Sequence, residues 1–462
     1  MANQNLVTSG FKVNRVELDY YSPVATLNNQ VITNMYAFLA RVDPWADDTN
    51  PVIPTQDQQY IKSVFKNIFV VKKIQTSQIS PVIQRFDWIS GLTYDFYQDN
   101  IDMFEVDQNG FLILQFYVKN RYDQVFKCLW NNNGSPSTFE PFFQPGSYGT
   151  NNIFVGADGY KWKYMYTIDI GSKRNFMDAT WMPVPVGANT PNPYLTNAGY
   201  GDVEVINVTN GGSGYDAVNS FIQVTVSGDG SGASGNVVVS GGSITNIVVG
   251  TAGQNYTYAN VSITAYTSSN LAQISTFGTG VNAIAPVSPV GGHGFDPISE
   301  LGCNRVMYTM EFNGSEGGYI PTNIEYRQVG LLANPSAIST YPNPATGSIY
   351  KTTTDFVLAS GFGAYISDET ITQQTANGQV YFTGTVLSFN PGTNVLNVIN
   401  TQGTPNINGT VFGSTSATGR TLLSVSNPDF ISMSGYLAYI ENRSGIQRSA
   451  DGIEALRFVL AY

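Results

Sequence analysis

Aromatic residues occupy every second position in the segment from Tyr160 to Tyr166. Its aromatic side chains fall on one face of an extended chain, and Lys161 and Lys163 fall on the other. A period of two is typical of a half-buried strand. The segment therefore predicts a strand with one aromatic face and one basic face.

The C-terminal part of the chain has strand patterns as well. Tyr436–Arg443 is strand-like, and a polar turn over residues 444–452 separates it from the apolar run Ile453–Tyr462. This last run predicts a final central strand. Most of the remaining chain consists of runs of about five to nine residues between Gly, Asn, Pro or Ser turns, which also predicts strands.

Helical spacing occurs in two places. Apolar residues recur every three or four positions from Ile61 to Phe69, which predicts a helix that begins near Thr55 or Gln56, after Pro54. The second place is Lys12–Tyr21, where the apolar positions fit either a helix or a strand.

The segment 201–270 contains an internal repeat. Val203–Val208, followed by Gly211–Tyr215, recurs 41 residues later as Ile244–Val249, followed by Gly253–Tyr256. Each copy predicts a strand, a Gly-rich turn that ends in Tyr, and a further strand. Because one such unit cannot bury both its faces, we expect the two copies to pair into one small β domain.

A second segment, 346–430, has the pattern of a compact β module. Gln379–Val386 and Val395–Ile399 alternate like the arms of a hairpin, and Asn390–Thr393 supplies the turn between them.

The sequence thus predicts a mainly β fold, an antiparallel two-layer β scaffold with a few short helices. Residues 1–200, 271–345 and 431–462 would form the scaffold, and 201–270 and 346–430 would be two inserted small β domains. The composition agrees with this prediction. Charged residues are 12% of the chain, about half the usual share, while Gly and Tyr are abundant.

The net charge of −11 disfavours a nucleic-acid partner, since phosphate binding needs clustered Lys and Arg. The densest basic cluster is predicted to lie in one helix, where we expect a solvated face: Lys62, Lys66, Lys72 and Lys73. The chain shows no signal-peptide pattern and no apolar run of membrane-spanning length, so we expect cytoplasmic synthesis and no membrane partner.

Candidate catalytic groups are few. His293 is the only histidine, and its setting among glycines predicts a loop or turn residue rather than a base. Cys128 and Cys303 are expected to be buried small apolar groups, and no zinc spacing exists. The acidic groupings are expected to be solvated turn acids: Asp47 with Asp48, Asp99 with Asp102, and Asp355 with Asp368 and Glu369. We therefore expect no enzyme activity, no metal site and no cofactor.

Aromatic residues in irregular segments are the candidate partner contacts, because buried interfaces are enriched in aromatics. Phe142, Phe143 and Tyr148 lie in one loop rich in Pro and Gly, together with Phe139. Trp45 lies in the turn after Asp43 and Pro44. Each would either contact a partner or fold onto its own domain.

Several segments, taken in order, resemble one protein family. They are Ala37–Trp45, Val82–Trp88, Val125–Leu129, the aromatic strand from Tyr160, Gly294–Phe295, Val329–Pro335 and Tyr436–Arg443. They are similar to the corresponding parts of the dimeric, mostly β baseplate wedge protein of T-even-like contractile-tailed phages. The resemblance covers about residues 11–200, 291–345 and 431–462. The two inserted segments are a departure from the shorter T-even form.

This resemblance implies a structural role without catalysis. The chain would be a homodimer that contacts other baseplate wedge proteins in the virion tail baseplate, assembled in the host cytoplasm. The alternative is a virion-surface tail fibre or spike that binds or cleaves host carbohydrate. That role would use exposed aromatic residues and an acid pair.

Overall fold

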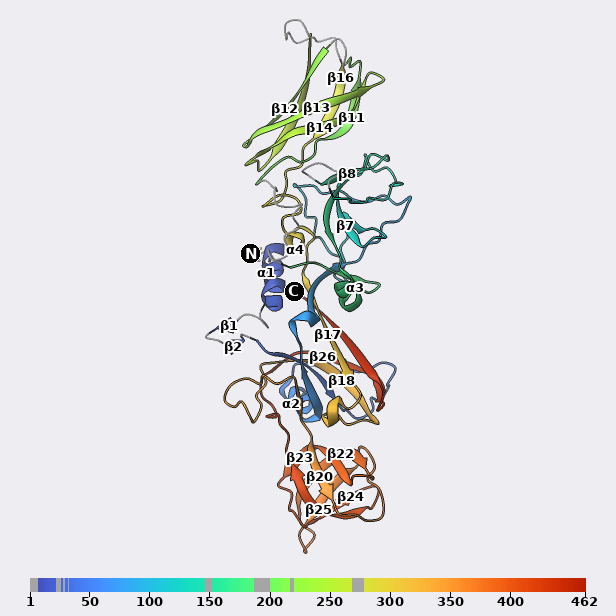
Figure 1. The fold of residues 1–462 in the computed structure, drawn as a ribbon, viewed down its shortest axis with the longest axis vertical. Helices are drawn as coiled ribbons and strands as arrows, with labels where there is room; N and C mark the ends of the chain where they lie inside the picture. The colour runs from blue at the N-terminus through green and yellow to red at the C-terminus, as the bar shows by residue number, and fades with distance from the viewer. Residues whose placement is uncertain are drawn as a thin grey trace, which may run out of the picture. The chain divides into compact units, whose positions relative to one another are not determined.

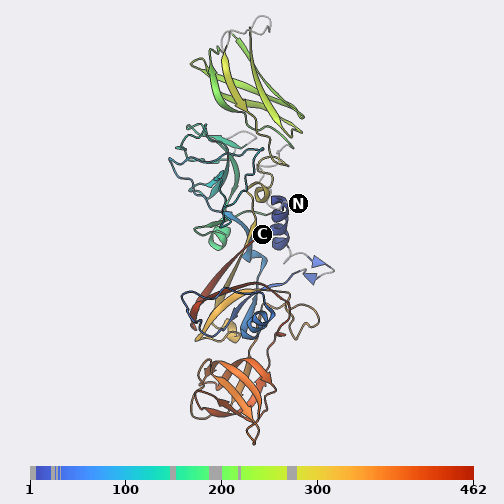
Figure 2. The ribbon, with the colours of Figure 1, turned by 180° about the vertical axis from the view of Figure 1, so that it is seen from behind.

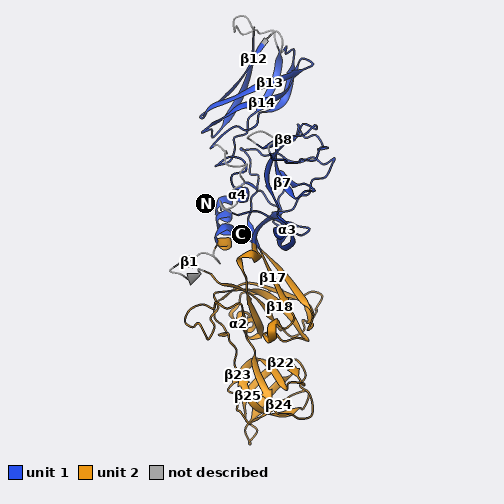
Figure 3. Ribbon diagram, viewed as in Figure 1, with its two compact units in different colours: residues 1–18, 80–307, 460–462 blue, residues 19–79, 308–459 orange. Residues whose placement is uncertain are grey.

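The computed structural model describes residues 7–21, 26–27, 30–31, 33–145, 152–186, 200–216, 220–267 and 278–462. Strands make up 45% and helices 10%, and the strands form several antiparallel sheets (Figure 1). The prediction of a mainly β chain with few short helices is confirmed. The chain divides into two compact units (Figure 3), the first of residues 1–18, 80–307 and 460–462, the second of residues 19–79 and 308–459.

The first unit contains most of helix α1 (Ser9–Tyr21), the short helices α3 (Ile170–Phe176) and α4 (Pro297–Glu300), and the strand pair β5 (Ile79–Gln84) and β10 (Trp181–Pro183). A four-stranded sheet has the order β6-β7-β9-β8. Its strands are β6 (Tyr117–Lys119), β7 (Gln124–Trp130), β9 (Lys161–Thr167) and β8 (Ile153–Val155). The aromatic segment predicted as a strand is therefore β9, an inner strand of this sheet.

The burial of β9 differs from the prediction. All its residues except Thr167 are buried, including Lys161 and Lys163. The aromatic face joins a core cluster with Phe126 and Cys128, while the basic face is covered by other segments of the unit. The strand is buried on both faces because those segments carry the acceptors that the lysines need.

The rest of the first unit is the glycine-rich module, which consists of strands β11–β16. Strands β11 (Asn207–Ser213), β16 (Thr279–Ile284), β15 (Ala259–Thr267) and β12 (Ser220–Gly228) form one sheet in that order. The hairpin of β13 (Ser231–Ser240) and β14 (Ser243–Gln254) forms a second sheet. Figure 2 shows the module from the side opposite to that in Figure 1. Residues of both sheets share one hydrophobic core.

Equivalent residues of the repeat meet in this core. Ile206 and Ile247, which are 41 residues apart, form a bridge with each other. Tyr215 and Tyr256 are also 41 residues apart and are both buried in the same cluster. The two copies therefore share one core, and the sheet also takes in β16, beyond residue 270. The predicted domain boundaries themselves stay a prediction.

The second unit is built on a five-stranded sheet in the order β19-β4-β3-β18-β26. Its strands are β19 (Ile349–Lys351), β4 (Ile68–Lys73), β3 (Met35–Ala40), β18 (Ile324–Ala333) and β26 (Tyr436–Arg448). Strand β17 (Arg305–Asn313), which begins in the first unit, is a neighbour of β27 (Ile453–Ala461). Two further short strands pair as β1 (Thr26–Leu27) and β2 (Gln30–Val31), and 3-10 turns span Thr76–Gln78 and Glu316–Gly318.

Helix α2 (Gln58–Asn67) packs on this sheet through Val64 and Phe65. It begins later than predicted, because the side chain of Asp57 accepts a hydrogen bond from the Tyr60 amide and caps the helix. It also ends earlier, since Ile68 is already extended and starts β4.

Three sequence predictions in the second unit need correction. Lys72 and Lys73 lie on strand β4 and not in the helix, and Lys72 pairs with Glu316 at 2.6 Å. Strand β26 continues through the predicted turn to Arg448, because Arg448 is still opposite Ile324 in the ladder with β18. Strand β27 is the last strand in its sheet order and therefore not central.

A closed antiparallel barrel completes the second unit, in the order β20-β23-β22-β21-β24-β25. Its strands are β20 (Thr354–Leu358), β21 (Thr370–Gln374), β22 (Val380–Asn390), β23 (Val395–Gly403), β24 (Thr410–Gly413) and β25 (Gly419–Ser426). The predicted hairpin is β22 paired with β23. The barrel has its own hydrophobic core, which includes Phe356, Phe382 and Leu396.

Gly330 of β18 lies opposite Ile440 of β26, close to the β26 backbone. A Cβ at this position would lie 2.2 Å from the Tyr439 carbonyl oxygen and 2.6 Å from the Phe38 ring. We expect Gly330→Ala to lower the free energy of unfolding by about 1–3 kcal/mol through overpacking. Thermal unfolding followed by calorimetry measures this change. Gly361→Ala is the control, because its Cβ would meet no atom closer than 3.7 Å; equal melting of the two variants would contradict the prediction.

Candidate partner-binding surface

The loop of residues 135–143, here called the aromatic loop, is held at its first half by Asp158. One oxygen of the Asp158 carboxylate accepts hydrogen bonds from the Thr138 amide at 2.8 Å, the Phe139 amide at 2.9 Å and the Ser137 hydroxyl at 3.1 Å. Asp158 lies in the tight turn that precedes β9. The sheet therefore fixes the backbone on which Phe139 is displayed.

The turn between β6 and β7 holds the second half of the loop. The Asn120 side chain donates to the Pro141 carbonyl at 2.9 Å. The Gln124 side chain donates to the Phe143 carbonyl at 2.8 Å and accepts from the Phe143 amide at 3.0 Å, as a neighbouring strand would. The loop contains no helix or strand, but several of its backbone groups have side-chain partners.

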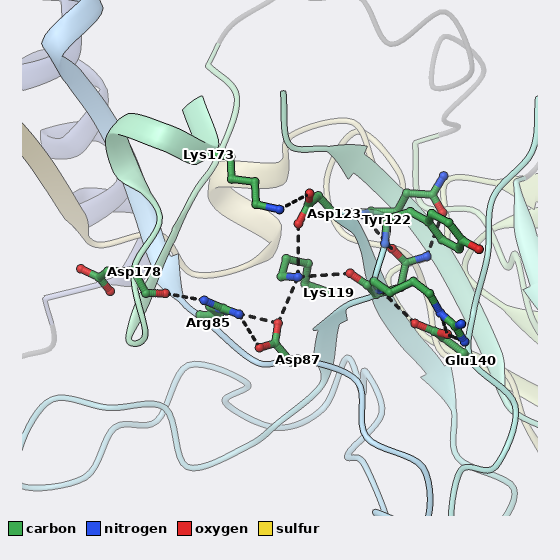
Figure 4. A network of polar contacts seen from close by, with 11 residues as sticks. Arg85, Asp87, Lys119, Tyr122, Asp123, Glu140, Lys173 and Asp178 are labelled. Atoms are coloured by element: carbon green, nitrogen blue, oxygen red, sulfur yellow. Dashed lines mark hydrogen bonds and ion pairs between the residues drawn. The ribbon is translucent and has the colours of Figure 1, made fainter. Parts of the chain in front are cut away.

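An ion-pair network supports this turn (Figure 4). Lys119 is buried, and its ammonium lies 3.1 Å from Asp87 and 3.3 Å from Asp123. Lys173 of α3 also pairs with Asp123, at 2.7 Å, and Arg85 pairs with Asp87, at 2.7 Å. Burial alone would raise the pKa of Asp87, but the hydrogen bonds and charges of Arg85 and Lys119 outweigh it and lower that pKa. The network thus favours the ionised form of Asp87.

Aromatic side chains protrude from this framework. Phe142 is 37% exposed, and its ring packs edge-on against the exposed ring of Tyr122, with 5.2 Å between centroids. Arg121 lies over the Tyr122 ring at 5.8 Å and also bonds Glu140 in the loop. Phe139 is exposed as well and stacks on Phe154. We call Tyr122, Phe139 and Phe142 the aromatic patch.

The structure separates the residues that the sequence grouped as partner contacts. Phe143 is 5% exposed and stacks on Tyr164 at 3.9 Å between centroids, so it belongs to the core of its own unit. Tyr148 lies outside the described residues. Trp45 belongs to the second unit, where it is half-buried and donates to the Arg443 carbonyl at 2.8 Å. The sequence analysis did not single out Tyr122 and Arg121. The one signal available for them was their place in a polar turn between two strands.

A second cluster of functional groups is fully buried in the first unit. Lys127 of β7 and Lys163 of β9 are directly opposite each other in the antiparallel ladder. Lys127 pairs with Glu300 of α4 at 3.0 Å, and Lys163 pairs with Glu204 at 2.6 Å. Lys161, two residues from Lys163, donates to the Ile206 carbonyl at 2.9 Å. We call these three lysines the lysine row.

His293 is part of this cluster. Its backbone lies in a turn, as predicted, but its side chain is buried. It is 1% exposed, and its Nδ1 lies 3.2 Å from the Lys127 ammonium. Its ring packs edge-on against Tyr97, and its Nε2 has no hydrogen-bond partner among the described residues. Burial and then the charge of Lys127 lower the pKa of His293 to about 3. The imidazole is therefore neutral and inaccessible to a substrate.

The acidic groupings serve local structure. Asp48 pairs with Arg327 at 2.8 Å, and Asp102 accepts from the Phe104 amide at 2.9 Å. Asp368 pairs with Arg41, and Glu369 accepts hydrogen bonds from Thr415 and Ser416. Cys128 and Cys303 are free and buried, as predicted. Within the described ranges, no three His, Cys, Asp or Glu side chains are placed to hold a metal ion.

The comparisons with known proteins add no family to this picture. A scan against protein-family models matches none of them, and a search of curated proteins gives no match. Among the helices that the structure describes, none has both the length and the apolar composition needed to cross a membrane.

The ion pair of Lys163 and Glu204 is buried, so removing one partner leaves the other charge without compensation. We expect Lys163→Met to lower the free energy of unfolding by roughly 3–5 kcal/mol. The double variant Lys163→Met, Glu204→Leu should recover most of this loss, because no unpaired charge remains. Thermal melting of both variants measures the effect. If the double variant were as unstable as the single one, the loss could not come from an unpaired buried charge, and the prediction would be wrong.

Two groups of the cluster, Glu300 and His293, predict loss of stability in acid. Burial raises the pKa of Glu300, but Lys127 and the hydrogen bonds outweigh it and lower that pKa to about 2 from 4.5. The pKa of His293 is lowered from 6.5 to about 3. Both groups bind protons more readily in the unfolded chain, so stability is full above about pH 6.5 and falls as the pH decreases toward 3.

Melting temperatures measured from pH 7 to pH 4 test this dependence. His293→Gln keeps a neutral polar side chain but cannot titrate, so its melting temperature should fall less between pH 6.5 and 4.5 than that of the wild type. Identical pH curves for the two proteins would contradict the prediction.

Proposed function

We propose that this chain is a structural, non-catalytic component of a contractile phage tail baseplate. It would be a wedge subunit that connects neighbouring wedge proteins by protein contacts, located in the virion and assembled in the host cytoplasm. The homodimer belongs to the same proposal, since it follows from the resemblance of the sequence to the wedge family.

The observation that carries the proposal is the aromatic patch on its fixed loop. Binding energy at protein interfaces is concentrated in a few aromatic and Arg side chains. Ordering a flexible loop on binding would reduce the net affinity. Here Asp158, Asn120 and Gln124 order the loop beforehand, so Phe139 and Phe142 are presented at little further entropic cost.

The location of the ionisable groups supports binding rather than catalysis. His293 and the lysine row are enclosed and paired, and the acidic groupings make ion pairs and hydrogen bonds to backbone amides. A general acid or base must reach its substrate within hydrogen-bond distance. The exposed aromatic patch of the first unit instead suits a protein contact.

We expect Phe139→Ala to weaken association with a neighbouring wedge protein by about tenfold or more, because the truncation removes an exposed aromatic anchor. The measurement is light scattering of the purified chain alone and mixed with the other candidate baseplate proteins from the same genome. Val290→Ala is the matched control, since Val290 is also an exposed apolar residue of the first unit.

The outcomes separate the candidate functions. A dimer that joins a larger complex, with association weakened by Phe139→Ala and not by Val290→Ala, supports the wedge role. A stable trimer that ignores the wedge proteins and binds or releases saccharide would overturn it in favour of a fibre or spike.

A further inference from the structure

Strand β26 is an edge strand of the five-stranded sheet, since it is the last strand in the order β19-β4-β3-β18-β26. An edge strand pairs on one side only, so alternate backbone N–H and C=O groups point away from the sheet. In residues 436–440, no backbone group bonds a described residue outside the ladder with β18. This part of the edge therefore keeps main-chain donors and acceptors available.

The available part of the edge has a defined end. Beyond residue 441, β26 contacts the segment that follows β3. The Trp45 indole donates to the Arg443 carbonyl at 2.8 Å, and the Asn442 side chain donates to the Val52 carbonyl at 2.8 Å. The open part is therefore residues 436–440, which span about 16 Å at about 3.3 Å per residue.

A groove of about 720 Å³ lies between this edge and helix α2, and we call it the β26 groove. Residues 436–440 form one side, and Ile61, Lys62 and Phe65 of α2 form the other. Both sides belong to the second unit. An extended peptide that pairs with a sheet edge adds a strand to the sheet and places alternate side chains in the neighbouring groove.

The lining of the β26 groove selects the side chains of such a peptide. Ile61, Phe65, Met433 and Leu437 supply apolar surface, and the flexible side chain of Met433 is 46% exposed. Among the described residues of the lining, Lys62 is the one with a charge. It is exposed, and no described acid lies within ion-pair distance of it. Apolar side chains and one acid are therefore complementary to the groove.

A second copy of this chain does not supply that complement. In a two-fold pair the same surface meets itself. Each copy would bring Lys62 and no acid from its groove, so the charges would repel. Ala438 is also a bulge residue, because its neighbours in β26 are opposite consecutive residues of β18. A bulge bends the edge and disfavours pairing with another rigid sheet edge.

We propose that the open edge of β26 binds an extended segment of a partner protein, which adds one strand to the five-stranded sheet. The segment alternates apolar and polar residues and carries an acid that pairs with Lys62. Main-chain hydrogen bonds to residues 436–440 supply affinity, and the side chains in the β26 groove supply specificity. The inference extends the assembly role proposed above, but it rests on the second unit and not on the aromatic patch.

The test uses the full chain and a fluorescent synthetic peptide with blocked ends, Glu-Thr-Val-Thr-Val-Thr-Val-Thr-Glu. Its Val and Glu side chains share one face, and an acid at each end can reach Lys62 whichever way the peptide runs. Two further peptides carry N-methyl groups on the Thr amides or on the Val amides. A fourth peptide has Lys in place of Glu. Binding is followed by fluorescence anisotropy.

The N-methylated peptides test main-chain pairing. The Thr and Val amides point to opposite edges of an extended peptide, and one of these edges faces β26. We therefore expect one N-methylated peptide to bind at least about tenfold more weakly than the parent, because its donors to β26 are lost. The other should bind like the parent.

The charge at Lys62 tests the acidic preference. Lys62→Glu should weaken binding of the Glu peptide at least about fivefold and strengthen binding of the Lys peptide, because attraction and repulsion are exchanged. Lys66→Glu is the matched control. It makes the same charge change at an exposed position of α2 that does not line the β26 groove. Circular dichroism checks that both variants are folded.

Three binding results would overturn the proposal: no binding of the parent peptide, equal binding of the two N-methylated peptides, and Lys62→Glu binding the Glu peptide no worse than Lys66→Glu. A dimer of the chain that the peptide splits into monomers would also overturn it and would assign the edge to a second copy. The assay contains no wedge protein, and Phe139→Ala should leave peptide binding unchanged. Failure of this inference and failure of the baseplate assignment are therefore distinguishable.

Discussion

Lys127 and Lys163 lie directly opposite each other inside the first unit, and the packing around them must supply a partner for each charge. Like charges at opposite positions of an antiparallel ladder repel, and a buried ammonium without a partner is costly. Lys127 and Lys163 are tolerated because Glu300 and Glu204 reach them from outside the sheet. The face of the sheet that carries the lysine row is therefore complete only when α4 and the segment leading into the glycine-rich module are in place. Once these segments cover the lysine row, β9 is buried on both of its faces.

The aromatic loop depends on the same use of charge. Only 12% of the residues are charged, and many of the described ones make contacts inside the protein. Lys119 fixes the turn that holds the loop, and Asp158 fixes the backbone of the loop itself. Polar groups thus provide the rigidity, and apolar rings provide the exposed surface. An interface of this kind is less sensitive to salt than one built on surface ion pairs.

The sequence predicted what local periodicity determines. The alternation in β9, the hairpin of β22 and β23, and the repeat that places Tyr215 and Tyr256 in one core were all visible in it. The start and end of α2 were predicted less well, because Ile68 and Phe69 continue the apolar pattern while the backbone becomes extended. An apolar run of that length fits either element.

Burial of charge could not be predicted in this way. Lys163 and Glu204 are 41 residues apart, and Lys127 and Glu300 are 173 apart, so no local pattern connects them. One available signal was Glu204 itself, an acid inside an apolar run. Phe142 and Phe143 show the same limit on a smaller scale. They are neighbours of the same type, yet Gln124 binds the backbone at Phe143 and turns its ring inward, while the ring of Phe142 remains at the surface.

The chain enters and leaves the barrel at one place. Asp355 of β20 is opposite Ser426 of β25, and just outside the barrel the Asp429 amide donates to the Lys351 carbonyl at 3.0 Å. A domain whose two ends adjoin can be exchanged for another with the same spacing while the surrounding sheet keeps its register. Recombination could therefore replace this part of the gene as a cassette, so that the barrel diversifies while the sheet that carries it is maintained.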